Sequence, residues 1–384
     1  MPERLRLRRA DRHDRKNLIA KHSQQCQIAH MKTLAMTLSV SLLALAACSG
    51  ANEANETETV AAPEAPPQKL QIYSARHYDS DQLLYDAFEE QTGVVIQVRE
   101  GNSNQLLETM KAEKDSSPAD LILAADAGAL WRFQNEGLTQ AFTTPALKQK
   151  IPASMRQEDG HWYGLTNRIR LVAYDPERIQ PEQVDNWADL ADPSLQGEIC
   201  VRTSSNIYNL SLMSEIIDRL GEETALGWAE GVVANMARDP QGGDTDQIRA
   251  VAAGECGIAI VNHYYWSRLA ESSVERDKQT VAATRLIIPS FGDGDGAHVN
   301  IAGAAITKTA EDPELAAQFI EFLLEDEGQA LLTSDTGEVT LNRLGNLDLP
   351  TGETTPYTVS STSLETYGIN QADAQRVYDL AGWK

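Results

Sequence analysis

Two adjacent tyrosines, Tyr264 and Tyr265, are the most informative residues of this chain for its chemistry. They follow an apolar, strand-like run at residues 257–261, where the strand should give way to a loop. A phenol is a poor metal ligand while protonated, and its free pKa is about 10. Once ionised it is a hard anionic oxygen, which suits a hard cation such as Fe(III). An aromatic pair that only packs at a strand end is the alternative, and the dipeptide alone favours it.

Two further strand ends carry residues of the same kind. An apolar strand at residues 70–73 leads into His77 and Tyr78, and a strand at residues 198–201 leads into Tyr208. Ligands of open α/β sheets bind beyond the carboxyl ends of the strands, so these side chains should meet in one crevice. Taken singly, His77 is more often a surface histidine and Tyr208 a core tyrosine. Together with the tyrosine pair they favour a metal site.

The elements that position these residues alternate between strands and helices. The sequence predicts strands at 70–73, 94–98 and 120–124, and helices at 80–91, 105–112, 127–135, 211–220, 223–236, 244–253, 313–333 and 371–380. This alternation predicts an α/β fold with a mostly parallel sheet and helices on both faces. Residues 69–384 exceed the length at which one core stops growing. We therefore expect two lobes, connected by extended segments at 169–174 and 285–288.

The N-terminal segment predicts export and lipidation. A basic start at Met31-Lys32 precedes an apolar run at 34–47, which ends in Leu45-Ala46-Ala47-Cys48. This pattern is typical of a lipoprotein signal peptide at 31–47, too short to span a membrane, with Cys48 as the lipid-modified residue. We expect residues 1–30 to be a mis-annotated upstream extension. Residues 48–68 have almost nothing to bury and should form a disordered tether.

The charge of the chain restricts its partners. Residues 1–47 contain nine Lys/Arg and three Asp/Glu, so their removal changes the formal net charge from −23 to −29. Such acidity argues against nucleic acid and anionic lipid as partners and mildly favours a cationic ligand.

Three motifs connect the chain with a known family. They are Ile72-Tyr73-Ser74 with His77-Tyr78, Arg202-Thr203-Ser204-Ser205-Asn206-Ile207-Tyr208-Asn209, and Ala259-Ile260-Val261-Asn262 with Tyr264-Tyr265. With these motifs, and over nearly all of its length from Leu70, the chain resembles the periplasmic ferric-iron-binding proteins of bacterial iron ABC transporters, in particular the Fut-like class of the Fbp proteins. The resemblance implies a two-lobed type II periplasmic binding protein that closes on one Fe(III) ion, with a hinge of two crossing strands. Lobe 1 would comprise 69–168 and 287–332, and lobe 2 would comprise 169–286 and 333–384, with the cleft between them.

The resemblance also implies a ligand set. It places the metal ligands at His77, Tyr78, Tyr208, Tyr264 and Tyr265. Four phenolates around Fe(III) leave an excess charge of −1, which is costly to bury without a partner. The resemblance places arginines behind the ligands at Arg168 and Arg268, where they could donate to phenolate oxygens. Solvated surface arginines are the alternative. The class more often has a small polar residue at the position of His263, and the glutamate and bound anion of other branches have no clear equivalent.

Two cysteines lie near the proposed ligands. Cys200 and Cys256 each precede a tyrosine, Tyr208 or Tyr264, by eight residues. An exported protein tends to pair such thiols, so a disulfide between neighbouring strands is expected. Two separate buried thiols are the alternative.

The predicted function is that of an extracytoplasmic solute-binding protein that binds Fe(III) through tyrosinates and delivers it to an ABC iron permease. We expect a monomer, lipid-anchored in the periplasm of a Gram-negative envelope, and no enzymatic activity. A protein of the same fold that binds a polyamine, thiamine or another small organic solute is the main alternative. A secreted hydrolase is less favoured, because the sequence contains no HExxH or GxSxG motif and its seven histidines show no ligand spacing.

Overall fold

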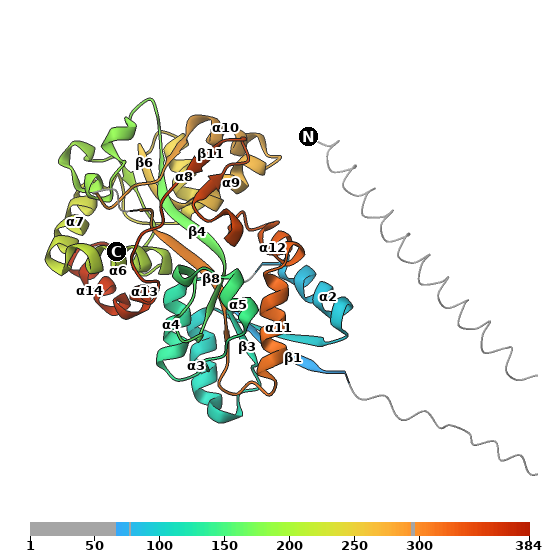
Figure 1. Cartoon of the computed structure of the whole chain (residues 1–384). Coiled ribbons are helices and arrows are strands. Elements are labelled where there is room, and N and C mark those ends of the chain that lie inside the picture. The colour runs from blue at the N-terminus through green and yellow to red at the C-terminus, as the bar shows by residue number, and fades with distance from the viewer. Residues whose placement is uncertain (1–66, 77, 293–295) are drawn as a thin grey trace, which may run out of the picture. The chain divides into compact units, whose positions relative to one another are not determined.

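The computed structural model describes residues 67–384, apart from residue 77 and residues 293–295. The predicted signal peptide at 31–47, the predicted lipidation site Cys48 and the candidate ligand His77 lie outside the described residues. Among the residues that are described, no helix has both the length and the apolar composition needed to span a bilayer. These residues fold into an α/β structure, as predicted (Figure 1).

One nine-stranded sheet runs through the described chain in the order β2-β1-β3-β8-β4-β6-β5, and β7 and β9 also pair with β4. Its strands are β1 (Lys69–Ser74), β2 (Val95–Glu100), β3 (Leu121–Ala124), β4 (Tyr163–Tyr174), β5 (Ile199–Cys200), β6 (Ile258–Asn262), β7 (Arg285–Ile287), β8 (Val299–Ile306) and β9 (Val339–Thr340). β1 is parallel to β2 and β3, and β5 to β6, whereas β4 and β8 are antiparallel to their neighbours. The sheet is therefore mixed rather than mostly parallel, because β4 and β8 carry the chain in opposite directions through its middle. A separate hairpin pairs β10 (Asn346–Asp348) with β11 (Thr354–Pro356).

Several helices begin or end at residues that the sequence marks. The helices are α2 (Asp81–Thr92), α3 (Ser103–Glu113), α4 (Ala127–Asn135), α5 (Pro145–Lys150), α6 (Ile207–Leu220), α7 (Glu222–Ala234), α8 (Asp244–Ala252), α9 (His263–Glu271), α10 (Glu275–Ala283), α11 (Pro313–Leu323), α12 (Asp326–Thr333), α13 (Thr366–Ile369) and α14 (Gln371–Ala381). Asn102 and Gln105 form a capping box at the start of α3. α2 ends at Gly93, whose φ of 73° is the left-handed conformation that glycine adopts without strain.

The long helix predicted at 313–333 is wrong, because the chain turns between α11 and α12. At this turn the backbone of Gly328 approaches the carbonyl oxygen of Phe322 so closely that a Cβ atom would lie 2.2 Å from it. Only glycine fits such an approach, and the turn directs α12 toward β4 and α2.

Strand β4 connects two parts of the sheet. Its residues 163–169 pair with β8, its residues 170–174 pair with β6, and all of its residues are buried. We call β1–β3 and β8 with α2–α4 and α11 the first lobe, and β5–β7 with α6–α10 and α14 the second lobe. Figure 1 shows β4 and β8 running side by side between these two groups. The segment predicted to cross at 285–288 contains β7, which pairs with residues 172–174 of β4, within the second lobe.

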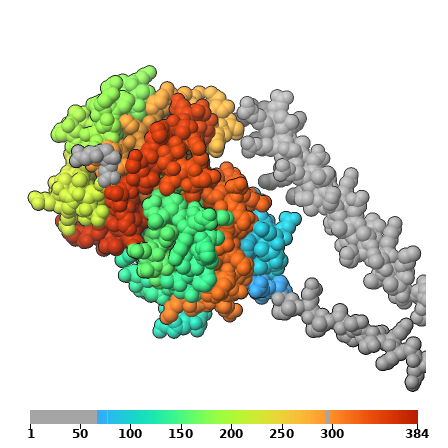
Figure 2. All heavy atoms as spheres, viewed as in Figure 1, coloured from blue at the N-terminus to red at the C-terminus, as the bar shows by residue number. Residues whose placement is uncertain are grey.

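The second lobe has apolar side chains on both faces of its part of the sheet. Along β6, Ala259 and Val261 join one hydrophobic cluster, whereas Ile258 and Ile260 join another, as the period of two in a strand requires. α14 packs against α6 and α7 on the second of these faces. In Figure 2 the C-terminal residues, coloured orange to red, lie across the middle of the visible face. Among these C-terminal segments, α13 contacts both α4 of the first lobe and α6 of the second.

Candidate metal centre

The four described candidate tyrosines all lie near the start of a helix. Tyr264 and Tyr265 are in the first turn of α9, which follows β6 directly, rather than in the predicted loop. Tyr208 is in the first turn of α6, where the side chain of Asn206 accepts a hydrogen bond of 3.0 Å from its backbone N–H. Tyr78 lies in the turn between β1 and α2. The predicted strand ends thus deliver these residues through short connections.

The three tyrosines of the second lobe lie against one another. The hydroxyl of Tyr264 donates a hydrogen bond of 3.1 Å to the hydroxyl of Tyr208. The rings of Tyr264 and Tyr265 are 4.5 Å apart between centroids. Tyr264 is fully buried, whereas Tyr208 and Tyr265 are partly exposed. Two phenol oxygens are therefore already within hydrogen-bond distance, and the ring of Tyr265 packs beside that of Tyr264 at a tilt of 32°.

Arg268 connects Tyr78 with this group. Its guanidinium carbon lies 5.5 Å from the ring centre of Tyr78, 5.0 Å from that of Tyr264 and 5.6 Å from that of Tyr265. Its Nε donates a hydrogen bond of 3.0 Å to the carbonyl oxygen of Thr336. The structure thus brings Tyr78 into the same cluster of aromatic rings and guanidinium groups as the second-lobe tyrosines.

Arg168 is buried behind the tyrosines, so the alternative of a solvated surface arginine is wrong at this position. Its side chain is 1 % exposed, and its guanidinium carbon lies 5.9 Å from the ring centre of Tyr208 and 5.8 Å from that of Tyr264. Its Nε and Nη1 atoms have no hydrogen-bond partner among the described residues. Buried donors of this kind are costly unless an acceptor is supplied. An ionised phenol oxygen of either tyrosine would be such an acceptor.

Burial keeps the phenols protonated in the metal-free protein. It raises the pKa of Tyr264 well above its ordinary value, and the neighbouring Tyr208 raises it further, while Arg168 opposes both effects. Burial likewise raises the pKa of Tyr208 and of Tyr78, although the positive charge of Arg168 acts to lower both pKa values. A metal that binds phenolate must therefore displace a proton from each of these hydroxyls.

Glu338 is a buried carboxylate of this site that sequence reasoning missed. It lies 2.8 Å from Nη2 of Arg168 and 3.6 Å from Nη1 of Arg76, and it accepts a hydrogen bond from Thr166. Although burial alone would raise the pKa of Glu338, the two guanidinium groups hold it below its ordinary value. Arg76 in turn lies 5.1 Å from the ring centre of Tyr78. No local sequence signal marks Glu338, which approaches Arg168 because the adjoining β9 pairs with β4.

Both ring nitrogens of His263 form hydrogen bonds with the backbone. Its Nδ1 accepts a hydrogen bond of 3.1 Å from the backbone N–H of Ile169, so the proton belongs on Nε2, which lies 3.0 Å from the carbonyl oxygen of Gly337. Burial lowers the pKa of His263 to about 4. The neutral ring connects β4, α9 and the segment before β9, and it has no free nitrogen for a metal.

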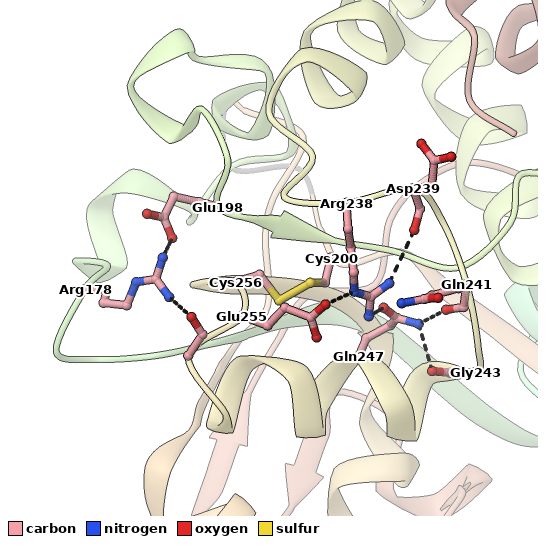
Figure 3. The surroundings of a disulfide bond; sticks show 11 residues. Arg178, Glu198, Cys200, Arg238, Asp239, Gln241, Gly243, Gln247, Glu255 and Cys256 are labelled. Atoms are coloured by element: carbon pink, nitrogen blue, oxygen red, sulfur yellow. Dashed lines mark hydrogen bonds and ion pairs between the residues drawn. A yellow bond between two sulfur atoms is a disulfide. The ribbon is translucent and has the colours of Figure 1, made fainter.

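A disulfide connects the strands that lead to two of the tyrosines. Cys200 of β5 and Cys256, just before β6, are bonded, with their Cα atoms 5.9 Å apart (Figure 3). β5 and β6 are parallel neighbours, with Cys200 opposite Ala259. Figure 3 also shows the ion pair between Arg238 and Glu255, which measures 2.8 Å, beside the disulfide. The bond fixes the two strands relative to each other eight residues before Tyr208 and Tyr264.

A cleft of about 500 Å³ adjoins Tyr208. It is lined by residues of the first lobe, including Asn102, Asp126 and Arg132, and by the segment 205–208 of the second lobe. Among the described residues, no group of three or more His, Cys, Asp or Glu side chains could hold a metal ion. Of the four described candidate tyrosines, Tyr208 lines this cleft.

Comparisons with known proteins agree with this architecture. Residues 116–354 match the family model described as bacterial extracellular solute-binding protein. Iron uptake protein A1 of Synechocystis sp. is 37 % identical over 329 residues, which cover 84 % of this chain and 91 % of that protein. The major ferric iron-binding protein of Neisseria meningitidis serogroup B is 27 % identical over 301 residues, which cover 77 % of this chain and 84 % of that protein.

A solved structure is similar over most of the described chain. It is a Trichodesmium protein in complex with iron and citrate ligands, 37 % identical, with a TM-score of 0.75. The match covers 82 % of this chain and all of that one. The relationship is thus seen in both sequence and fold.

Proposed function

The chain belongs to the family of bacterial extracellular solute-binding proteins, and on that premise we propose that it binds Fe(III) in the periplasm and delivers it to the permease of an ABC transporter. The relatives named above are an iron uptake protein and a ferric iron-binding protein, which supports a role in transport rather than in catalysis. The observation that carries the proposal is the group of four tyrosines, one from the first lobe and three from the second, around Arg168 and Arg268.

The proposed ligands are the phenolates of Tyr78, Tyr208, Tyr264 and Tyr265, together with His77. Four phenolates and one Fe(III) ion leave a net charge of −1, which needs a counter-charge in a buried site. Arg168 supplies that charge, and its unpaired N–H groups become donors to the phenolate oxygens. Glu338 holds Arg168 in place and balances part of its charge while the tyrosines are neutral.

The arrangement supports a sequential mode of binding. The three second-lobe tyrosines already touch, so iron binds there first. Tyr78 and His77 complete the coordination when the first lobe closes over the metal by bending at β4 and β8. The closed form then distinguishes loaded from empty protein for the permease.

The proposed location follows from the N-terminal segment. Residues 31–47 direct export, Cys48 receives the lipid, and residues 48–68 connect the anchor to the folded part. The protein acts as a monomer on the periplasmic side of the membrane to which its lipid attaches it.

Visible spectroscopy tests the proposal. Phenolate-to-Fe(III) charge transfer absorbs visible light, so adding Fe(III) as its nitrilotriacetate complex to metal-free protein should produce an orange to red colour at one iron per chain. Protein that stays colourless and binds no iron would refute the proposal. It would favour the rival function in which the same cleft binds a small organic solute.

A further inference from the structure

The carboxylate of Asp244 is buried beneath the tyrosines of the second lobe. Asp244 is the first residue of α8, a position where acidic side chains usually remain in solvent near the helix N-terminus. Here the side chain is fully buried and accepts hydrogen bonds from three other segments. Its partners are Arg170 of β4, Arg202 after β5 and the backbone N–H of Asn262 at the end of β6. These segments carry or adjoin the second-lobe tyrosines.

One set of contacts leads from Asp244 to Tyr264. The Oδ2 atom of Asp244 accepts a hydrogen bond of 2.8 Å from the backbone N–H of Asn262. The side-chain amide of Asn262 donates to the hydroxyl of Tyr264 at 3.4 Å. Asn262 is also the residue at which β6 gives way to α9. The carboxylate therefore fixes the point from which Tyr264 and Tyr265 project.

A second set of contacts leads to Tyr208. Arg202 donates to Oδ1 of Asp244 at 3.1 Å, and its guanidinium carbon lies 5.3 Å from the ring centre of Tyr208. Arg170 donates to Oδ2 of Asp244 at 2.7 Å and, through its other terminal nitrogen, to Oδ1 of Asn209 at 2.6 Å. Asn209 follows Tyr208 directly, and its amide donates to the carbonyl oxygens of residues 202 and 203. Asp244 is thus bonded to both arginines that flank the Tyr208 segment.

We propose that Asp244 is a positioning residue of the iron site, which holds Tyr208 and Tyr264 in register before the metal arrives. This inference rests on the proposed function. Charge-assisted hydrogen bonds from two guanidinium groups are short and directional, so the carboxylate fixes the geometry of both arginines. The disulfide joins Cys200, the last residue of β5, to Cys256 before β6. Asp244 holds Arg202 beyond β5 and Asn262 at the end of β6, nearer to the proposed ligands. Residues that orient metal ligands from behind commonly contribute 10- to 100-fold, in order of magnitude, to metal affinity.

Asp244→Asn tests the inference, because it keeps the shape of the side chain but leaves it unable to serve all three donors. We expect Fe(III) affinity, measured by competition with nitrilotriacetate, to fall roughly 10- to 100-fold. We also expect the charge-transfer band to shift, because the angle between the Tyr208 and Tyr264 oxygens changes. A loss of global stability alone would not move that band in the protein that remains folded and iron-loaded.

Asp277→Asn is the matched control. Asp277, on α10, is also a buried carboxylate. It accepts hydrogen bonds of 2.6 Å from Arg249 and 2.7 Å from Ser272. Its loss should destabilise the same lobe without a shift of the band or a change of affinity beyond about twofold. Equal changes in the Asp277→Asn and Asp244→Asn variants would overturn the inference, and so would an Asp244→Asn variant that binds iron like the unaltered protein.

Iron binding by the unaltered protein shows whether a negative result contradicts this inference or the proposed function. If that protein binds no iron, the proposed function itself fails; if it binds iron and the Asp244 variant behaves identically, only the positioning role fails. Should Asp244→Asn not fold, Arg202→Gln replaces it, because the Arg202 side chain is 18 % exposed and Asp244 keeps Arg170 as a partner. Arg202→Gln should weaken binding and shift the band in the same direction, and an unchanged band and affinity would overturn the inference.

Discussion

The hydroxyl of Tyr264 donates a hydrogen bond of 3.1 Å to the hydroxyl of Tyr208, although 56 positions separate the two residues in the chain. A neutral phenol is needed as the donor in this contact, and burial keeps Tyr264 neutral by raising its pKa. A trivalent cation between the two oxygens would replace the shared proton. The metal-free protein thus holds two proposed ligands together by the proton that iron must expel.

Removing either hydroxyl of the tyrosine pair should change the colour of the iron-loaded protein. In Tyr264→Phe and Tyr265→Phe, one phenolate is lost, so the charge-transfer band should weaken or shift and the affinity for Fe(III) should fall. Absorption spectra and competition titrations provide the measurement. Tyr163→Phe is the control, because Tyr163 is a buried tyrosine whose hydroxyl donates to the carbonyl oxygen of Phe142. Unchanged spectra in both pair variants would exclude the pair as ligands.

Iron binding should release protons and weaken as the pH falls. The raised pKa values of Tyr78, Tyr208 and Tyr264 mean that these phenols are neutral near pH 7, so each must lose one proton to bind. Each of these three phenols should therefore release a proton when iron binds. Calorimetry in buffers of different ionisation enthalpy counts these protons, and an acid titration of iron-loaded protein should lose colour and iron together. Release of one proton or fewer would contradict a four-phenolate site.

Glu338→Gln should affect the metal-free protein more than the iron-loaded protein. The change leaves Arg168 buried without its carboxylate, whereas Arg76 keeps Asp81 at 3.0 Å. Breaking a buried pair such as that of Arg168 and Glu338 costs about 3–5 kcal/mol. In the iron-loaded protein, the phenolates supply negative charge to Arg168, so part of that cost is recovered. Thermal unfolding with and without Fe(III) measures the difference: iron should raise the melting temperature of the variant more than that of the unaltered protein. An equal increase in both would show that Arg168 does not respond to the phenolates.

Iron should also make the protein more compact. Because the proposed ligands come from both lobes, a complete coordination sphere requires closure, and small-angle scattering should give a smaller radius of gyration with Fe(III) than without. In Tyr78→Phe the first lobe loses a ligand, so closure should weaken more than the initial binding to the second lobe. Identical scattering curves for the two states would contradict the closure mechanism. They would not contradict the ligand assignment, which the absorption spectra test separately.

The sequence alone was sufficient to predict the α/β class and the segments that deliver Tyr78, Tyr208 and the tyrosine pair. These predictions succeed because they rest on local signals: apolar runs of strand length, and polar or aromatic residues where a strand ends. His77 as a ligand remains a prediction, because it lies outside the described residues.

The charged groups behind the tyrosines were decided by tertiary structure. Glu338 reaches Arg168 only because β9 pairs with β4, across 170 positions of the chain, and Asp244 reaches Arg170 across 74. In the sequence each of these carboxylates is an ordinary acidic residue in an acidic chain. Their roles arise from burial, which removes water as a partner and leaves each carboxylate and guanidinium dependent on the other. That dependence is a property of the packed interior, and no local pattern of residues encodes it.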